Sequence, residues 1–147
     1  VLVITGAVDL DDAIRAAAGT SDRVTVLHHP GWQAGQATSL RLAIDAAHRQ
    51  DADAVVVGLG DQPFVDPEAW RNVAASRSPI AVATYAGRRR NPVKLHRSIW
   101  DSIPSEGDEG ARTLMRLRPE LVEEVPCPGS PDDIDTEEDL PPWPRRS

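Results

Sequence analysis

Short apolar runs alternate with amphipathic stretches along the chain. The runs are rich in valine and isoleucine, which favours buried strands, and the stretches between them repeat apolar residues at helical spacing. This alternation is typical of a three-layer α/β fold with a mostly parallel sheet. The pattern predicts strands at residues 1–5, 24–27, 54–58, 79–85 and 121–125, and helices at 10–18, 38–50, 67–75, 97–103 and 109–117.

One segment interrupts the parallel pattern. Residues 87–95 follow the predicted strand at 79–85 almost directly, which indicates a short antiparallel, hairpin-like excursion. Pro92 has no backbone N–H, so we expect this excursion at a sheet edge. Arginines 88–90 together with Lys94 would then form a cationic lip able to hold a small anion. A solvated turn is the competing interpretation of these charges.

Residues 55–67 are the candidate centre of the fold. A valine run breaks at Gly58 and leads through Gly60 to Asp61. Ligands of open α/β sheets bind at the carboxyl edge of the strands, so Asp61 is placed where a cation or a polar substrate would be held. The glycines allow close approach of the backbone. Two other interpretations of Asp61 stay open: simple turn chemistry, and the phospho-acceptor of a receiver-like signalling domain.

Several polar residues have the positions of helix caps. Asp9, Asp66 and Asp108 each precede a predicted helix, and Asp66 is followed by proline at the first helical position. We expect Asp108 to be structural rather than catalytic. Thr136 and Asp139 have the spacing of a capping box in the acidic segment near the C-terminus.

A long polar loop occupies residues 28–40. Thr38 or Ser39 is predicted to cap the following helix, whose free N–H groups could then bind a phosphate or the edge of a base. A capped surface loop, with Trp32 covering the core, is the competing interpretation.

Composition narrows the class of protein. With 147 residues, 40% hydrophobic and 27% charged, the chain can bury the core of one domain, expected at residues 1–140, ahead of a flexible tail at 141–147. The net charge of -7 and pI near 5.0 argue against a nucleic-acid surface. No segment reaches the length of a membrane span, so we expect a soluble cytoplasmic protein.

Metal-binding residues other than carboxylates are few. Cys127 is the single cysteine, which can form neither an internal disulfide nor a zinc site. His28 and His29 are adjacent on a strand end and would point to opposite faces, so we do not expect them to share an ion.

The chain begins with Val1, directly on a strand pattern and without a leading segment. We therefore expect the native protein to be longer, with the preceding strand and loop carried on the same chain or on a separate one.

Four sequence blocks carry a family resemblance. They are Pro30-x-Trp32-x-x-Gly35-x-x-x-Ser39-Leu40, Gly60-Asp61-Gln62-Pro63-Phe64-Val65, the Gly-Arg-Arg-Arg-Asn-Pro-Val run at 87–93, and residues 107–112 followed by 133–140. In order and spacing this set resembles the MobA-like nucleotidyltransferases, most closely the molybdenum cofactor cytidylyltransferase branch. The resemblance covers nearly the whole chain.

The resemblance implies a Rossmann-like enzyme. Such an enzyme moves a nucleoside monophosphate from a nucleoside triphosphate, with CTP or GTP favoured, onto a phosphate-bearing acceptor such as molybdopterin cofactor, and releases pyrophosphate. Asp61 matches the aspartate that holds Mg²⁺, and Asp135 is similar to the second acidic position near that metal. The other matched positions are Gly35, Ser39 and Gly60 for the nucleotide, and Arg88, Asn91 and Pro92 for the acceptor.

The chemistry agrees with these implied roles. Nucleotidyl transfer needs charge neutralisation and in-line positioning more than covalent help from the protein. Mg²⁺ is commonly held by one or two carboxylates together with phosphate oxygens and water, which Asp61 and Asp135 could provide.

Two departures from the family pattern concern the substrates. The glycine-rich signature loop that grips the triphosphate is absent from this sequence, and His29 stands where relatives usually have asparagine. The base and the acceptor are therefore left open. An inactive family member that binds or hands over a cofactor is the alternative. A receiver-like domain is disfavoured, because the first predicted strand ends in Gly6 and Ala7 rather than in acidic residues.

Overall fold

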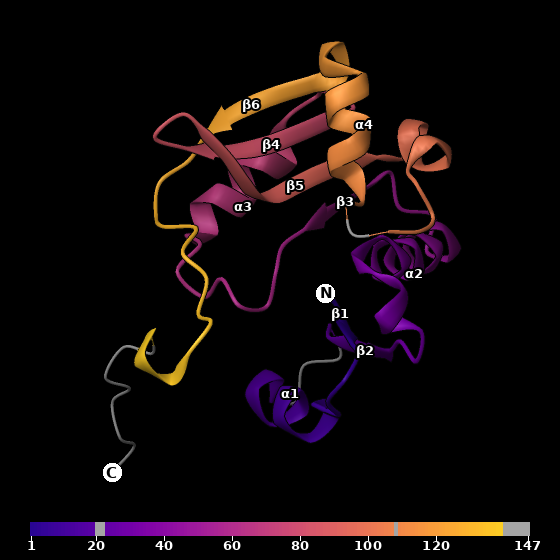
Figure 1. Cartoon of the computed structure of the whole chain (residues 1–147), viewed down its shortest axis with the longest axis vertical. Helices are drawn as coiled ribbons and strands as arrows, with labels where there is room; N and C mark the ends of the chain where they lie inside the picture. The colour runs from indigo at the N-terminus through magenta and orange to yellow at the C-terminus, as the bar shows by residue number, and fades with distance from the viewer. Residues whose placement is uncertain (20–22, 108, 140–147) are drawn as a thin grey trace. The chain divides into compact units, whose positions relative to one another are not determined.

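The computed structural model describes residues 1–19, 23–107 and 109–139 (Figure 1). The chain divides into two compact units, each described below by itself. Within the described residues, no helix has the length and apolar character needed to cross a bilayer. The elements, in chain order, are β1 (Leu2–Thr5), α1 (Asp11–Ala18), β2 (Thr25–His28), η1 (Trp32–Ala34), α2 (Gln36–Arg49), β3 (Ala54–Val57), α3 (Pro67–Ala75), β4 (Ile80–Tyr85), β5 (Arg88–His96), η2 (Arg97–Ser102), α4 (Ala111–Leu117), η3 (Pro119–Leu121), β6 (Val122–Pro126) and η4 (Glu137–Asp139).

The first unit comprises Val1–Val55 and Arg97–Pro119. Its strands β1 and β2 pair in parallel, with Leu2 opposite Thr25. Helix α2 packs against β1. Its buried residues recur at helical spacing, which explains why this stretch forms an amphipathic helix. They are Ala37, Leu40, Ile44, Ala46 and Ala47.

The second unit comprises Val56–His96 and Glu120–Ser147. Its four-stranded sheet has the order β3–β5–β4–β6, in which β4 runs antiparallel to β5 and parallel to β6. Every residue of β4 is buried, and α3 packs on β4 and β5 through Ala69 and Val73. The predicted α/β fold with a mostly parallel sheet and one antiparallel excursion is confirmed. The tail predicted at 141–147 lies outside the described residues.

The antiparallel excursion is an inner strand, so the predicted edge position of Pro92 is wrong. Strand β5 lies between β3 and β4. Its register with β4 shifts from Val82 opposite Val93 to Ala83 opposite Arg90. This irregularity leaves residues 91 and 92 without partners on β4. A bulge of this kind accommodates a proline inside a sheet, because no ladder hydrogen bond is needed there.

The predicted helix starts are partly confirmed. Asp66 caps α3, since its Oδ1 accepts a hydrogen bond from the Glu68 N–H at 2.7 Å. Helix α1 begins at Asp11, and Asp9, two residues ahead of it, accepts a hydrogen bond through Oδ1 from the Asp11 N–H at 3.0 Å.

The caps predicted for α2 and α4 are not confirmed. Helix α2 begins at Gln36, ahead of both residues predicted to cap it, Thr38 and Ser39, so that prediction is wrong. Asp108 lies outside the described residues.

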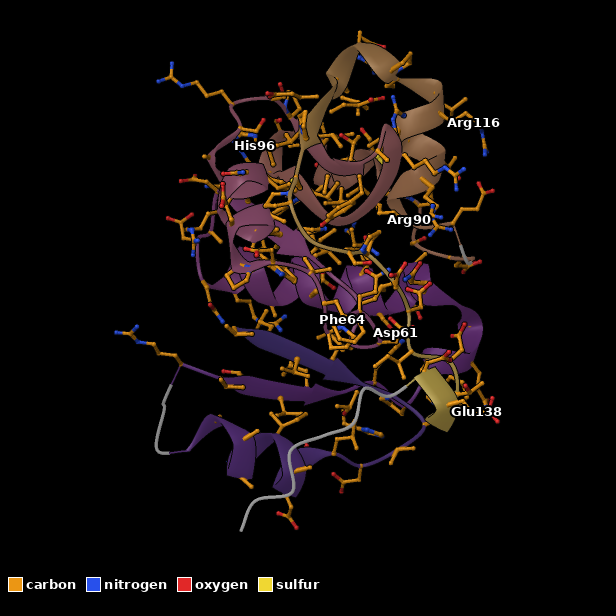
Figure 2. The ribbon with its side chains drawn as sticks, turned by 90° about the vertical axis from the view of Figure 1, so that its left-hand side faces the viewer. Asp61, Phe64, Arg90, His96, Arg116 and Glu138 are labelled. Atoms are coloured by element: carbon orange, nitrogen blue, oxygen red, sulfur yellow. The ribbon has the colours of Figure 1, made fainter. Side chains whose placement is uncertain are left out.

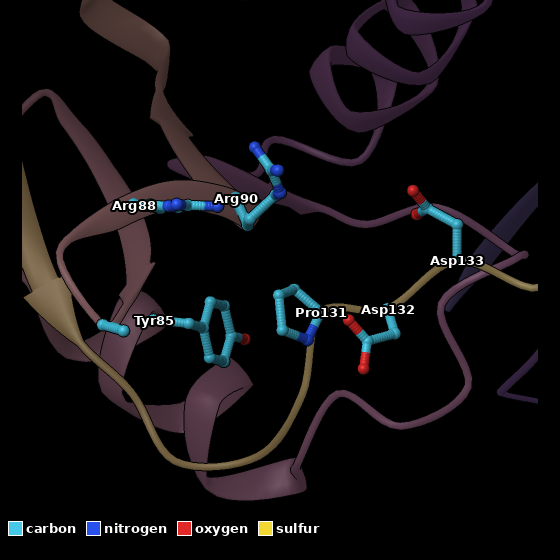
Figure 3. A pocket seen from close by; sticks show the side chains of 7 residues that line it. Tyr85, Arg88, Arg90, Pro131, Asp132 and Asp133 are labelled. Carbon is cyan, nitrogen blue, oxygen red and sulfur yellow. The ribbon is translucent and has the colours of Figure 1, made fainter.

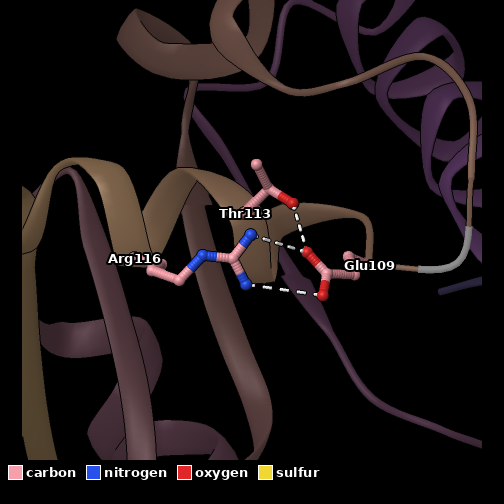
Figure 4. A network of polar contacts seen from close by, with 3 residues as sticks. All are labelled: Glu109, Thr113 and Arg116. Atoms are coloured by element: carbon pink, nitrogen blue, oxygen red, sulfur yellow. Dashed lines mark hydrogen bonds and ion pairs between the residues drawn. The ribbon is translucent and has the colours of Figure 1, made fainter.

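A polar network links the start of α4 to its last turn (Figure 4). The Glu109 carboxylate accepts from the Thr113 hydroxyl at 2.7 Å and from the Arg116 guanidinium at 3.0 and 3.4 Å. Arg116, and after it Thr113, hold the pKa of Glu109 below its ordinary range. An acidic group at the helix start also suits the helix dipole.

Candidate functional site

The loop that follows β3 presents the first acidic candidate. β3 ends at Val57, and the Trp70 ring covers Gly58, where a Cβ would lie 2.3 Å from a ring carbon. A larger residue there would displace the ring, so the close approach at Gly58 is that of the Trp70 side chain, and a close approach of a ligand to either glycine stays a prediction. At Gly60 a Cβ would meet nothing within 4 Å, and Asp61 is exposed (Figure 2). The loop is therefore tightly packed where it begins and open at its aspartate.

A segment that follows β6, residues 129–135, contacts this loop. The Ile134 N–H donates to the backbone carbonyl of Asp61 at 2.8 Å. Asp135 is the next residue in the chain. The structure thus brings two aspartates, far apart in sequence, into contacting backbone segments.

The side chains of Gln62 and Asp133 also join these segments, and the sequence analysis did not select either of them as a site residue. The Gln62 amide Nε2 donates to the Asp133 carboxylate at 2.6 Å and to the Pro131 carbonyl at 3.2 Å. Gln62 is only 7% exposed. Only the position of Gln62 next to Asp61 could have indicated a role for it, because its partners Pro131 and Asp133 come from a distant part of the chain.

The carboxylates of Asp61 and Asp135 are free to bind a ligand. Both side chains are exposed, and neither forms a hydrogen bond or an ion pair with another described residue. The Asp135 N–H donates to Asp139 Oδ2 at 3.3 Å, and Thr136 donates to the same oxygen from its amide at 2.9 Å and its hydroxyl at 2.8 Å. These Thr136 bonds lower the pKa of Asp139 and confirm half of the predicted capping box.

This donor set fits one kind of metal. No group of three or more histidine, cysteine, aspartate or glutamate side chains that could hold an ion occurs within the described ranges. Two available carboxylates without histidine or cysteine suit Mg²⁺ or Mn²⁺, which take oxygen ligands and complete their shells with phosphate and water.

A pocket of about 310 Å³ lies beside the β4–β5 turn. Arg88 and Arg90 project from β5 on one side, and residues 131–133 form the other side (Figure 3). Successive side chains of a strand point to opposite faces. Accordingly Arg89 is directed elsewhere, and its Nε pairs with the Glu124 carboxylate at 2.7 Å. Neither pocket arginine forms an ion pair with a described residue, so both charges are available to an anion.

Lys94 does not contribute to the predicted cationic lip, which is a correction. Its side chain is buried, and its ammonium group donates to the backbone carbonyl of Ser76. The reason is the length of β5: the strand continues past the bulge into the buried part of the sheet, opposite Ala81.

Asn91 and Pro92 lie at the bulge next to this pocket. The Tyr85 hydroxyl donates to the Asn91 carbonyl at 3.2 Å, and the Tyr85 ring lines the pocket. Burial raises the pKa of Tyr85, which favours the neutral phenol that makes this bond. Pro92 is fully buried and Asn91 half-buried. Their predicted contact with an acceptor stays a prediction.

The remaining predicted nucleotide ligands, Gly35 and Ser39, belong to the first unit. Gly35 has φ +106°, a conformation that favours glycine, and it precedes the first residue of α2. The Thr38 hydroxyl donates to the Gly35 carbonyl at 2.7 Å, and the His29 Nε2 lies 2.8 Å from the same hydroxyl. Ser39 is half-buried. His29 therefore supports the turn that sets the start of the helix.

Comparison with known proteins shows the family to which this chain belongs. The sequence profile described as "MobA-like NTP transferase domain" matches residues 1–125, so the chain belongs to this family, as its motifs predicted.

Two characterised relatives are similar over most of the chain. Nicotine blue oxidoreductase of Paenarthrobacter nicotinovorans is 28% identical over an alignment of 131 residues, which covers 80% of this chain and 62% of the relative. The purine catabolism protein PucB of Bacillus subtilis (strain 168) is 31% identical over an alignment of 110 residues, which covers 71% of this chain and 54% of PucB. The chain thus spans less than two thirds of the length of either relative.

Three solved structures share the fold of this chain. The crystal structure of Mycobacterium tuberculosis Rv0371c in complex with manganese matches with a TM-score of 0.69 and 29% identity, covering 94% of this chain and 74% of that one. A second crystal structure of Rv0371c matches with a TM-score of 0.70 and 28% identity, over 94% and 71% of the two chains. The homologue from Mycobacterium sp. strain JC1 shares the fold, with a TM-score of 0.65, 23% identity, and coverage of 94% and 70%.

Proposed function

We propose that this chain belongs to a Mg²⁺-dependent nucleotidyltransferase. The enzyme would transfer a nucleoside monophosphate from CTP or GTP to a phosphate-bearing acceptor of the molybdopterin type. An acceptor phosphate oxygen attacks the α-phosphorus, the bond between that phosphorus and the bridging oxygen breaks, and pyrophosphate leaves. The single observation that carries this proposal is the 2.8 Å hydrogen bond from the Ile134 N–H to the Asp61 carbonyl, because it holds two acidic segments together.

Asp61 and Asp135 are the proposed metal ligands. A bound Mg²⁺ would neutralise phosphate charge and orient the triphosphate. Family membership and the described carboxylates support this role. So does the related Rv0371c structure, which is a complex with manganese, an ion that also takes oxygen ligands.

Gly35 and Ser39 in the first unit, and separately Gly60 in the second unit, are the proposed nucleotide contacts. The backbone near Gly60 is open enough for a ligand to approach, and the N-terminal turn of the fourteen-residue helix α2 offers N–H groups that favour anions. Each of these two features supports a nucleotide contact within its own unit.

The acceptor would be held in the pocket beside the β4–β5 turn. Arg88 and Arg90 offer two guanidinium groups, which bind phosphate through paired, charge-assisted hydrogen bonds. Asp132 and Asp133 also line this pocket and would disfavour an anion that the arginines do not reach. This combination favours a ligand whose phosphate lies toward β5.

The direct test of the proposed function is a thermal-shift panel on the full-length protein. Each of the four nucleoside triphosphates is added with and without Mg²⁺. We expect CTP or GTP to raise Tm by several degrees, and only with Mg²⁺, because a ligand at about 100 times its Kd stabilises the folded state by roughly 2.7 kcal/mol. If none of the four nucleotides raised Tm above that of the nucleotide-free protein in Mg²⁺, the result would argue against a triphosphate substrate.

The pocket arginines give a second prediction. Replacing both Arg88 and Arg90 by alanine should weaken binding of a pterin phosphate by about 100-fold or more, since two side chains are removed and each lost hydrogen bond to a charged group contributes roughly 1.5–3 kcal/mol. Triphosphate affinity should change far less. Calorimetric titration with each ligand separately measures the two effects.

Arg89→Ala is the matched control for this prediction. It removes one guanidinium group from the same strand, but the Arg89 side chain pairs with Glu124 outside the pocket. If Arg89→Ala weakened acceptor binding as much as the double variant, general surface charge rather than the pocket would explain the effect.

A second candidate function is binding or handover of a cofactor without nucleotidyl transfer. The 28% identity to nicotine blue oxidoreductase favours it, because that name denotes redox chemistry. Pyrophosphate release from a triphosphate in the presence of acceptor separates the two candidates: the transferase releases it and the binding module does not.

A further inference from the structure

Gln62 is a buried polar side chain with an unusual set of contacts. It is 7% exposed, and its Nε2 donates to both Asp133 and Pro131, at 2.6 and 3.2 Å. Its Oε1 is covered and has no hydrogen-bond partner among the described residues. Among the described residues, the Gln62 amide therefore forms hydrogen bonds through its Nε2 donor and not through its Oε1 acceptor.

These contacts span two segments that also meet through their backbones. Ile134 donates to the Asp61 carbonyl at 2.8 Å, and the residues on either side of it, Asp133 and Asp135, belong to the same short run. Gln62 adds side-chain bonds to Pro131 and Asp133. The run from residue 131 to 134 is thus held at three points to the loop that carries Asp61.

From this arrangement we infer that Gln62 is a positioning residue, which fixes Asp135 beside Asp61 without touching the metal or the substrate. The inference deepens the proposed function and rests on the metal site proposed there. Partners that orient metal ligands typically change metal affinity by about 10- to 100-fold when they are removed.

A carboxylate cannot replace the amide at this position. In Gln62→Glu the oxygen that replaces Nε2 would face the Asp133 carboxylate and the Pro131 carbonyl, where three acceptors would meet without a proton. The shape of the side chain is kept, and no bond is lost at Oε1 because none exists there among the described residues. The variant thus isolates the role of the donor.

The double variant Gln62→Glu with Asp133→Asn restores the main bond in reverse. The amide introduced at position 133 would donate to the carboxylate introduced at position 62, and the two side chains would again have one negative charge between them. Gln50→Glu is the control for the added charge, since Gln50 is exposed beyond the end of α2.

Two measurements on the full-length protein test the inference. Calorimetric titration with Mn²⁺ alone should show Kd raised by about 10- to 100-fold in Gln62→Glu, restored to within about threefold of wild type in the double variant, and unchanged in Gln50→Glu. Hydrogen exchange at the Ile134 amide should be about tenfold faster or more in Gln62→Glu alone, because its bond to Asp61 opens more often.

The two readouts separate the inference from the proposed function. Wild-type protein that does not bind Mn²⁺ would overturn the metal site, and the inference that rests on it. Normal Mn²⁺ affinity in Gln62→Glu would overturn the positioning role while leaving the metal site intact. Loss of affinity that the double variant does not restore, or unchanged exchange at Ile134, would also overturn it.

Discussion

Asp61→Asn should reduce Mg²⁺-dependent pyrophosphate release by about 100-fold or more. The substitution keeps the size of the side chain and leaves the backbone carbonyl that accepts from Ile134 in place, so it removes one negative charge from the proposed metal site. Charge stabilisation in a preorganised site is commonly the largest single contribution to catalysis. The assay follows pyrophosphate from triphosphate plus acceptor, at several Mg²⁺ concentrations.

Asp45→Asn is the matched control for this variant. Asp45 is a surface residue of α2, 3.4 Å from Arg41 in an i,i+4 pair, and such pairs contribute roughly 0.3–0.5 kcal/mol. Its activity should equal that of wild type. If Asp61→Asn also retained wild-type activity, Asp61 would not be a ligand of an essential metal.

Leu95→Ala should lower the free energy of unfolding by about 2–5 kcal/mol. Leu95 is 1% exposed and lies in the inner strand β5, opposite Ile80 of β4, which is fully buried. Removing its side chain leaves a cavity between elements that cannot close around it easily. Because β5 also carries Arg88 and Arg90, the loss would loosen the strand that forms one side of the pocket. Urea unfolding followed by circular dichroism measures the change.

Leu117→Ala gives the comparison for the same chemical change. Leu117 is 68% exposed at the end of α4, so its truncation should change stability by no more than about 0.5 kcal/mol. Similar losses in the two variants would mean that Leu95 does not lie in a tightly packed core.

Local signals in the sequence were sufficient for much of the fold. The valine-rich run before Gly58 predicted β3, and Asp66 followed by proline predicted the start of α3, because both depend on neighbouring residues. The turn before Arg88 was also predicted as the centre of an antiparallel pair. Each of these features is encoded within a few residues of where it occurs.

Features that depend on distant partners were not predictable in this way. The inner position of Pro92 required the register shift opposite Val82, and the burial of Lys94 required the Ser76 carbonyl as acceptor. Residue type makes Thr38 or Ser39 a candidate helix cap, but the helix begins earlier, at Gln36, and the Thr38 hydroxyl donates to the carbonyl of Gly35, which precedes it.

The candidate site shows the same division. Asp61 and Asp135 were selected by their motifs, and their metal role is still a prediction. Gln62 was missed, because a glutamine in a loop is ordinarily a solvated residue, and only the approach of residues 131–133 makes its amide a buried donor. Arg90 differs from Arg89 only through strand alternation and the Glu124 carboxylate, which a run of three arginines does not reveal.

The shared binding of one divalent ion by Asp61 and Asp135 can be observed directly in crystals of the full-length protein grown with Mn²⁺ and a nucleoside triphosphate. We predict one anomalous peak within coordination distance of a carboxylate oxygen from each aspartate, about 2.0–2.2 Å away. A peak bound by other residues, or by one of the two aspartates without the other, would contradict the joint metal site.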